Sequence, residues 1–132
     1  MTTIIVDIDG TLLRSGIYPI RKTIEWINER SSKYTIAIVT GRPRSTESKT
    51  RTALKDAGVK FNSLHMNSGS TNMSNQYKRQ EAEKINAKNK VVLAIDNDAG
   101  ARAAYKSVGI KTVSPTGLSG TLLASSKLWR IR

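Results

Sequence analysis

Three aspartates stand directly after apolar runs of this sequence. Asp7 and Asp9 follow the run at residues 4–6, one residue apart, and Asp96 follows the run at 91–95. Carboxylate oxygens that meet in one place are the ligands that a hard cation such as Mg²⁺ prefers, and the cation in turn binds phosphate oxygens. A carboxylate that stays free of the metal can act as a nucleophile or as an acid–base group. The three aspartates therefore predict chemistry on an anionic substrate such as a phosphate.

Two other segments could complete a phosphate site. Thr40 offers a hydroxyl group, and Gly41 lets the backbone approach a phosphate closely because it has no side chain. A lysine from the region 76–88 could balance the charge on a transferring phosphoryl group. Each piece is common when it occurs alone. The prediction depends on their order and on their position at the ends of predicted strands.

The elements that must position these residues alternate along the chain between strand and helix. Apolar runs predict strands at 3–8, 34–39, 60–66, 91–95 and 110–113. Helical spacing and end signals predict helices at 20–31, 43–57, 76–87 and 98–108, with Pro43 in the first turn of the second helix and a loop at 67–75. This alternation predicts right-handed βαβ units and a mainly parallel five-stranded sheet with helices on both faces. Ligands then bind beyond the carboxyl ends of the strands.

Length and composition limit the class of protein. The 132 residues predict one domain, residues 1–132, with a core at 3–113 and a C-terminal tail at 114–132. No apolar run reaches the ~18 residues of a membrane span, and no secretory signal is expected. Cysteine is absent, which excludes disulfides and cysteine-ligated metals. A cytoplasmic location, in a bacterium or a phage-infected host cell, is the expectation.

The charge of the chain is strongly positive. Lysine and arginine total 22 against 10 acidic residues, a formal net charge of +12. Four of the ten acids, the three aspartates above and Asp98, belong to the predicted site, so the rest of the chain is even more basic. A surface of this kind attracts polyanions, and nucleic acid or a nucleotide is the expected partner, although the charge could serve solubility alone.

The quoted segments resemble the motifs of the haloacid dehalogenase superfamily. DIDGT at 7–11 matches the first motif, D-x-D-G-T, and VTGR at 39–42 matches the second, a strand that ends in threonine or serine. Lys78 resembles the third motif, a lysine at a helix start, although Lys84 or Lys88 could compete for that role. AIDND at 94–98 resembles the fourth, an acidic cluster after a strand. The resemblance implies a Rossmann-like three-layer α/β/α sandwich.

The resemblance also implies a mechanism. Asp7 would attack phosphorus and form an aspartyl-phosphate, while Asp9 would protonate the leaving group and then activate water. Thr40 and Lys78 would hold the phosphoryl oxygens, and Mg²⁺ would be bound by Asp7, the backbone carbonyl of Asp9, and Asp96. Substrate contacts are further expected from the backbone around these motifs, at Gly10, Thr11 and Gly41. The second aspartate favours a phosphatase over the dehalogenases and some mutases of the family.

One position departs from the family pattern. Many relatives carry two adjacent acids in the fourth motif, whereas here the second position is Asn97, followed by Asp98. Asn97 can still orient water or a ligand through hydrogen bonds. Asp98 either compensates for the missing acid or caps the following helix, and the cap or a supporting role is favoured.

The spacing between the motifs leaves no room for a cap domain over the site. Open sites in this family tend to act on large substrates such as nucleic acid or protein. The segments 39–45 and 94–110 resemble the phosphatase domain of polynucleotide kinase/3′-phosphatases, whereas the phosphate-binding motif of the kinase half is absent. Removal of phosphate from nucleic-acid ends, with contacts from Arg14, Arg42 and Arg44, is the leading expectation. These arginines could instead form a solvated basic face.

Two alternatives stay open. A nucleotidase or another small-molecule phosphatase would turn over mononucleotides with little dependence on salt. A nucleic-acid-binding protein that has kept the fold and lost activity is the third possibility, and Asn97 is its only sign. The tail carries Leu122, Leu123, Leu128, Trp129 and Ile131 among basic residues. It is expected to pack on the edge of the sheet, with dimerisation or base stacking as alternatives.

Overall fold

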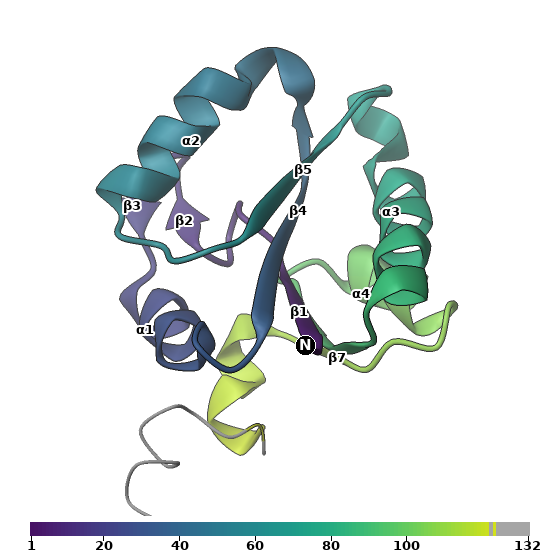
Figure 1. The fold of residues 1–132 in the computed structure, drawn as a ribbon. Coiled ribbons are helices and arrows are strands. Elements are labelled where there is room, and N and C mark those ends of the chain that lie inside the picture. Colours follow the sequence, from purple (N-terminus) through teal and green to yellow (C-terminus); the bar gives the residue numbers. More distant parts are fainter. Residues whose placement is uncertain (122, 124–132) are drawn as a thin grey trace, which may run out of the picture.

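A five-stranded parallel sheet forms the centre of the computed structural model, which describes residues 1–121 and residue 123 (Figure 1). The order of the strands across the sheet is β5-β4-β1-β6-β7. Their bounds are β1 Thr3–Val6, β4 Thr35–Pro43, β5 Ser63–Asn67, β6 Val91–Ile95 and β7 Thr112–Val113. Because β1 is central and apolar on both faces, Asp7 lies at the middle of the carboxyl edge of the sheet.

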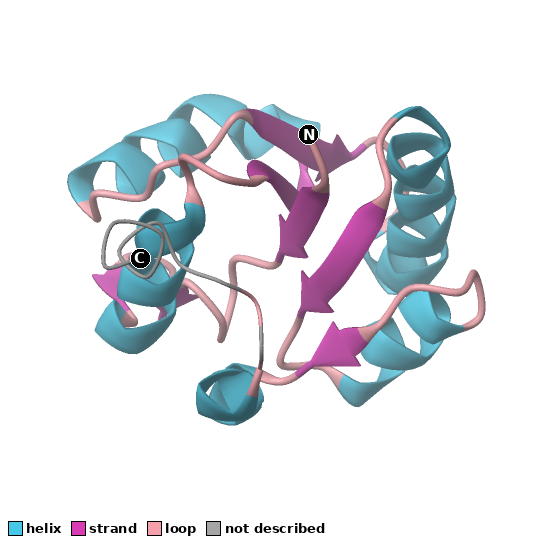
Figure 2. Cartoon of the chain, turned by 60° about the horizontal axis from the view of Figure 1, so that its bottom comes forward, coloured by secondary structure: helices cyan, strands magenta, loops and turns pink. Residues whose placement is uncertain are grey.

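Helices cover both faces of the sheet and make the three layers that the sequence predicts (Figures 1 and 2). One core cluster joins the sheet to α1 (Arg21–Arg30), α2 (Glu47–Asp56) and the short 3₁₀ helix Pro115–Gly120. The other joins it to α3 (Ser74–Lys88) and α4 (Ala99–Lys106). Strand alternation divides the side chains between the clusters: Ile4 and Val6 belong to the first, and Ile5 to the second.

A small hairpin is the only structure between β1 and α1. Its strands are β2 (Leu13–Arg14) and β3 (Tyr18–Pro19), which pair antiparallel, and its turn has positive φ angles of 51° at Ser15 and 85° at Gly16. Two residues with positive φ are typical of the tight turns that match the twist of a hairpin. No cap domain is present within the described residues, as expected.

The boundaries differ from the prediction around β4. This strand continues to Pro43, and the short 3₁₀ helix Arg44–Thr46 precedes α2, so Pro43 ends a strand rather than opening a helix. The pairing of β4 with β5 shifts between Thr40 and Pro43, which accommodates a residue that cannot donate to the ladder. The predicted loop at 67–75 also contains the 3₁₀ helix Thr71–Met73 and the first two residues of α3.

The C-terminal segment is described only in part. Leu123 packs against the first core cluster, and its carbonyl oxygen accepts a 3.1 Å hydrogen bond from Nε of Arg30. The expectations for Leu122, Leu128, Trp129 and Ile131 concern positions outside the described residues. In the part of the chain that the structure describes, no helix has both the length and the apolar character needed to cross a membrane.

Candidate active site

A polar cleft of about 330 Å³ opens at the carboxyl edge of the sheet. It lies beyond the ends of β1, β4 and β6 and beside the first turn of α3, which is where parallel α/β sheets bind ligands. Eight of its ten lining residues belong to the predicted motifs, and they are Asp7, Asp9, Gly41, Arg42, Lys78, Asp96, Asn97 and Asp98. The other two are Ser74 and Asn75.

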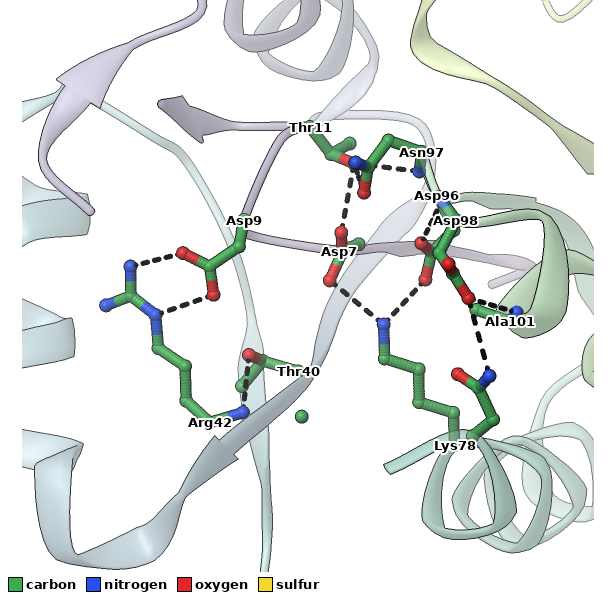
Figure 3. Close-up of polar contacts among 12 residues, drawn as sticks. Asp7, Asp9, Thr11, Thr40, Arg42, Lys78, Asp96, Asn97, Asp98 and Ala101 are labelled. Atoms are coloured by element: carbon green, nitrogen blue, oxygen red, sulfur yellow. Dashed lines mark hydrogen bonds and ion pairs between the residues drawn. The ribbon is translucent and has the colours of Figure 1, made fainter. Parts of the chain in front are cut away.

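Lys78 joins two of the aspartates at the bottom of the cleft (Figure 3). Its Nζ lies 3.0 Å from Oδ1 of Asp7 and 2.7 Å from Oδ2 of Asp96. All three side chains are buried, and Asp96 is completely so. The other oxygen of Asp96 accepts a hydrogen bond of 3.0 Å from the backbone N–H of Asp98. The structure therefore selects Lys78 over its competitors Lys84 and Lys88 as the lysine that reaches the aspartates.

One cation between two carboxylates leaves this buried group with an excess of negative charge. Burial, together with the nearby charge of Asp96, raises the pKa of Asp7 to about 6, and this exceeds the opposing effect of Lys78. Burial by itself lowers the pKa of Lys78. The charges of Asp7 and Asp96 and their hydrogen bonds raise it by more, so the pKa of Lys78 lies above its ordinary value and the lysine stays protonated. The cluster therefore has room for additional positive charge.

Asn97 and Thr11 contact the oxygen of Asp7 that faces away from the lysine. The hydroxyl of Thr11 donates to Oδ2 of Asp7 at 3.1 Å and accepts from the N–H of Asn97 at 3.2 Å. One end of the Asn97 amide lies 3.0 Å from the same Oδ2 and 2.8 Å from the carbonyl oxygen of Asp9. The hydrogen-bond network favours the orientation with the nitrogen there, in which Asn97 donates both hydrogen bonds; rotation of the amide by 180° places its oxygen beside the other two oxygens.

That group of oxygens fits a divalent cation. Neighbouring ligands of an octahedral Mg²⁺ ion lie about 2.9 Å apart when each metal–oxygen bond is about 2.1 Å. The contacts of 2.8 and 3.0 Å around the Asn97 amide agree with that separation. Within the described residues, no three acidic or histidine side chains gather closely enough to hold a metal by themselves. A metal at this position would have Asp7 Oδ2 and the carbonyl of Asp9 as ligands, with the Asn97 amide oxygen joining them once the amide is rotated.

Asp9 is held on the other side of the cleft by Arg42. Nε and Nη2 of Arg42 donate hydrogen bonds to its carboxylate, at 2.9 and 2.8 Å. The side chain of Asp9 therefore points away from Asp7 (Figure 3). The guanidinium also donates to the hydroxyl of Thr50 in α2 and to the carbonyl of Gly16 in the hairpin. Hydrogen bonding to Asp9 raises the pKa of Arg42. The arginine thus connects Asp9 to two elements outside the cleft.

The second motif lies where the backbone of β4 passes the first turn of α3. Thr40 is fully buried, and its hydroxyl accepts the N–H of Arg42 at 3.0 Å. A Cβ atom on Gly41 would lie only 2.8 Å from Cβ of Ser74, so no side chain fits there. Gly10 has a φ of +79°, and a Cβ there would meet the Asn97 amide at 2.3 Å. Both glycines are therefore required by close approach, at Gly10 with a positive φ as well.

Asp98 caps α4, as favoured from the sequence. Its Oδ2 accepts the N–H of Ala101 at 2.8 Å, and its backbone is extended as in other N-cap residues. The amide of Asn75 donates to the same oxygen at 3.4 Å. The carboxylate of Asp98 is therefore occupied by the helix.

The remaining predicted arginines lie outside this cleft. Arg14 is exposed in the hairpin, and Arg44 lines a separate small pocket beside Tyr77. Three lining or supporting residues were not singled out from the sequence, and they are Ser74, Asn75 and Thr50. The available signal for Asn75 was its position three residues before Lys78 at a helix start. The first turn of α3 also borders the cleft, and the N-terminus of a helix favours an anion.

A buried carboxylate thus lies beside a lysine in an open, charged cleft at the carboxyl edge of a parallel sheet, and no cap domain covers it within the described residues. The sequence model of the haloacid dehalogenase-like hydrolases matches residues 4–99. The chain belongs to this family, which confirms the resemblance and the fold class expected from the motifs and makes the protein a hydrolase-family enzyme.

Two solved structures share the fold. One is a chain in the structure of the Pnkp1/Rnl/Hen1 RNA repair complex, with a TM-score of 0.72, 14% identity, and coverage of 86% of this chain and 42% of that chain. The present chain thus spans less than half the length of that protein. The other is the core domain of a protein assigned as a phosphoglycolate phosphatase from Streptococcus pneumoniae TIGR4. It has a TM-score of 0.53, 20% identity, and coverage of 98% of this chain and 93% of that chain. Among curated protein sequences, none matches this chain.

Proposed function

We propose that this protein is a Mg²⁺-dependent phosphomonoester hydrolase that removes phosphate from nucleic-acid ends through a phosphorylated Asp7. The observation that carries the proposal is the contact of Lys78 with Asp7 at the base of an open, uncapped cleft. A carboxylate is a weak nucleophile in water. Burial and a fixed neighbouring cation give it a defined direction of attack and a means to receive a dianionic phosphate.

The reaction has two displacements at phosphorus. In the first, a carboxylate oxygen of Asp7 bonds to phosphorus, the ester bond breaks, and Asp9 gives its proton to the departing oxygen. In the second, Asp9 takes a proton from water, the water oxygen bonds to phosphorus, and the bond to Asp7 breaks. Inorganic phosphate leaves and both aspartates are restored. The proton of Asp9 is thus returned in each cycle.

The residues around Asp7 fit a Mg²⁺ ion. Asp7 Oδ2, the carbonyl of Asp9 and the amide oxygen of Asn97 would hold it, and Asp96 would add its negative charge. When bound, the cation supplies positive charge to phosphate oxygens and offsets repulsion between substrate and carboxylates. Lys78, the first turn of α3 and the backbone of Gly41 bind the phosphoryl oxygens from the protein side. Thr40 fixes the backbone around Gly41, because its hydroxyl accepts a hydrogen bond from the N–H of Arg42.

Nucleic acid is the substrate class that best fits the surface. Apart from the four aspartates of the site, the sequence has 22 basic residues and only six acidic ones. No cap domain within the described residues limits the size of a substrate at the cleft. The RNA repair complex that contains a chain of this fold agrees with this class of substrate. We take a 3′-phosphate as the first substrate because the second and fourth motifs resemble those of 3′-phosphatases.

The test is phosphate release with Mg²⁺ from a matched panel. The panel holds a 3′-phosphorylated oligonucleotide, its 5′-phosphorylated isomer, 3′- and 5′-mononucleotides, and p-nitrophenyl phosphate. Asp7→Asn is the control, since it preserves the shape of the side chain and removes the nucleophile. Preference for the 3′-phosphorylated oligonucleotide, lost in Asp7→Asn and weakened by salt, supports the proposal.

Other outcomes lead to other functions. Preference for mononucleotides with little effect of salt makes the protein a nucleotidase. Tight oligonucleotide binding without release of phosphate from any member makes it an inactive nucleic-acid-binding protein. Release that persists in Asp7→Asn contradicts the assigned nucleophile whatever the substrate.

A further inference from the structure

A second, larger groove lies next to the catalytic cleft. It has a volume of about 850 Å³ and runs between the β2–β3 hairpin and α2. Gly16 and Ile17 line it from the hairpin, and Lys49 and Thr52 line it from the helix. We infer that this groove binds the strand of nucleic acid that carries the phosphate. The inference rests on the proposed function, to which it adds a place for the substrate.

Arg42 separates the groove from the cleft and lines both. Its guanidinium contacts Asp9 on the side of the cleft, and it contacts Thr50 of α2 and Gly16 of the hairpin on the side of the groove. The two hollows therefore adjoin each other across one side chain. A substrate with its phosphate in the cleft passes over or beside the Arg42 side chain to reach the groove.

The geometry of the reaction points the substrate in this direction. In an in-line displacement, the departing oxygen leaves phosphorus opposite the attacking oxygen of Asp7. The same oxygen must lie within hydrogen-bond reach of Asp9, which protonates it. The side chain of Asp9 extends from Asp7 toward Arg42 (Figure 3). The sugar that bears the departing oxygen therefore lies on the Arg42 side of the cleft, where the groove begins.

The chemistry of the groove matches a single strand. Its volume falls within the range of small-ligand pockets, about 300–1,000 Å³. Lys49 supplies a positive charge for a backbone phosphate, and the hydroxyls of Thr46, Ser48 and Thr52 supply hydrogen bonds. Ile17 is 62% exposed, and its apolar side chain offers a surface for the face of a base. Sites for single strands combine positive charge with side chains on which bases stack; here Lys49 and Arg42 outnumber the one acidic lining residue, Asp56.

Two exposed residues of the hairpin, Tyr18 and Arg14, lie near the groove in the chain but do not line it. Tyr18, which follows Ile17, is 56% exposed, and it pairs across the hairpin with Arg14. Among the described residues only Met1 and Met73 are the other large apolar side chains with comparable exposure. An exposed aromatic ring beside an arginine can stack on a base and contact its phosphate. This pair gives Arg14 a role next to the groove rather than in the cleft.

Two variants and one matched control test the inference. Lys49→Glu reverses a charge in the groove, and Thr52→Trp fills part of its volume. Lys55→Glu makes the same change of net charge on the same helix but does not line the groove. The first measurement is fluorescence anisotropy of a labelled, single-stranded 3′-hydroxyl oligonucleotide, which is the product of the reaction and requires no catalysis. The second is kcat/KM for the 3′-phosphorylated oligonucleotide relative to that for p-nitrophenyl phosphate.

We expect Lys49→Glu and Thr52→Trp to weaken oligonucleotide binding about tenfold and to lower the ratio of kcat/KM values by a similar factor. Loss of one phosphate contact in Lys49→Glu also lowers the slope of log K against log salt by about 0.7. Lys55→Glu keeps the binding and the ratio of the unchanged protein. The inference is overturned if all three variants bind the oligonucleotide with the same affinity. It is also overturned if a phosphopeptide binds more tightly than the oligonucleotide and loses affinity in the two groove variants. Absence of phosphate release from both substrates in the unchanged protein contradicts the proposed function instead, while the binding data still decide the role of the groove.

Discussion

Lys78 donates a 2.7 Å hydrogen bond to Asp96, which is completely buried. The same amino group also reaches Asp7 at 3.0 Å, so one lysine neutralises charge on the strand ends of β1 and β6. We expect Lys78→Met to abolish phosphate release and to lower the free energy of unfolding by about 3–5 kcal/mol, because two buried carboxylates lose their cation. Urea unfolding in EDTA measures this loss.

A second substitution checks the cause of that loss. Adding Asp96→Asn to Lys78→Met removes one of the unpaired charges and should restore part of the stability without restoring activity. A double variant no more stable than Lys78→Met would show that packing of the lysine side chain, and not its charge, supports the site.

The raised pKa of Asp7 makes stability depend on pH. Burial favours its protonated form in the folded protein, with a pKa of about 6 against an ordinary value of 3.8. The contribution of Asp7 to stability is therefore fully present below pH 3.8 and is lost as the pH rises through 6. Asp7→Asn does not ionise, so its stability relative to the unchanged protein should increase by about 2 kcal/mol between pH 4 and pH 7.

Urea unfolding in EDTA at these two pH values measures the difference. EDTA matters because a cation at the site would favour the ionised form of Asp7 and oppose the shift. A difference in stability that is the same at both pH values would place the pKa of Asp7 in the folded protein near its ordinary value.

Asn97 should determine the response to Mg²⁺. Asn97→Leu has a similar size but lacks the amide oxygen, so the Mg²⁺ concentration for half-maximal activity should rise about tenfold or more. Asn97→Asp supplies a carboxylate oxygen at the same position and should keep Mg²⁺ binding. Stabilisation of the fold by added Mg²⁺, followed by thermal unfolding, reports binding without catalysis. An unchanged response in Asn97→Leu would exclude the amide as a ligand.

The role of Asp9 is visible in the choice of leaving group. A sugar hydroxyl needs a proton as it departs, whereas p-nitrophenolate leaves readily without one. Asp9→Asn should therefore reduce kcat/KM about 10²–10⁴-fold for a 3′-phosphorylated oligonucleotide and much less for p-nitrophenyl phosphate. Equal losses for both substrates would indicate that Asp9 does not act as the acid in the first step.

Asp98 should matter for the helix rather than for the reaction. Its carboxylate accepts the N–H of Ala101, so Asp98→Ala removes the N-cap of α4 and should cost about 1 kcal/mol of stability. We expect kcat with saturating Mg²⁺ to change by about twofold or less. Thermal unfolding and p-nitrophenyl phosphate hydrolysis are the measurements, and a large loss of activity without a loss of stability would assign Asp98 to the metal.

Several features of the fold followed from local patterns. Apolar runs at 3–8 and 91–95 contain β1 and β6 because strands buried on both faces need continuous apolar residues. The grouping of the acidic and glycine residues after these runs was also predictable, because the carboxyl ends of parallel strands meet at one edge of the sheet. The N-cap role of Asp98 was also readable, because it depends on residues only three positions away.

Boundaries that depend on long-range pairing were less accurate. Pro43 has a good local preference for a helix start, yet β4 continues to Pro43 because β5 pairs alongside it as far as Asn67. The first turn of α3 begins at Ser74, two residues before its predicted start, where it packs closely on Gly41 of β4. Contacts between segments distant in the sequence determine where such strands and helices begin and end, and the local sequence carries no information about those contacts.

The sequence alone determined the order of the motifs, the parallel α/β architecture and the aspartates that meet at its edge, because each depends on residue types and short spacings. The tertiary structure decided which lysine reaches them, that Asn97 faces Asp7 and the Asp9 carbonyl, and that Arg42 links Asp9 to Thr50 and Gly16. These relations join segments far apart in the sequence, up to 90 residues for Asp7 and Asn97. Their distances exist only once both faces of the sheet are packed, which is why no local pattern could predict them.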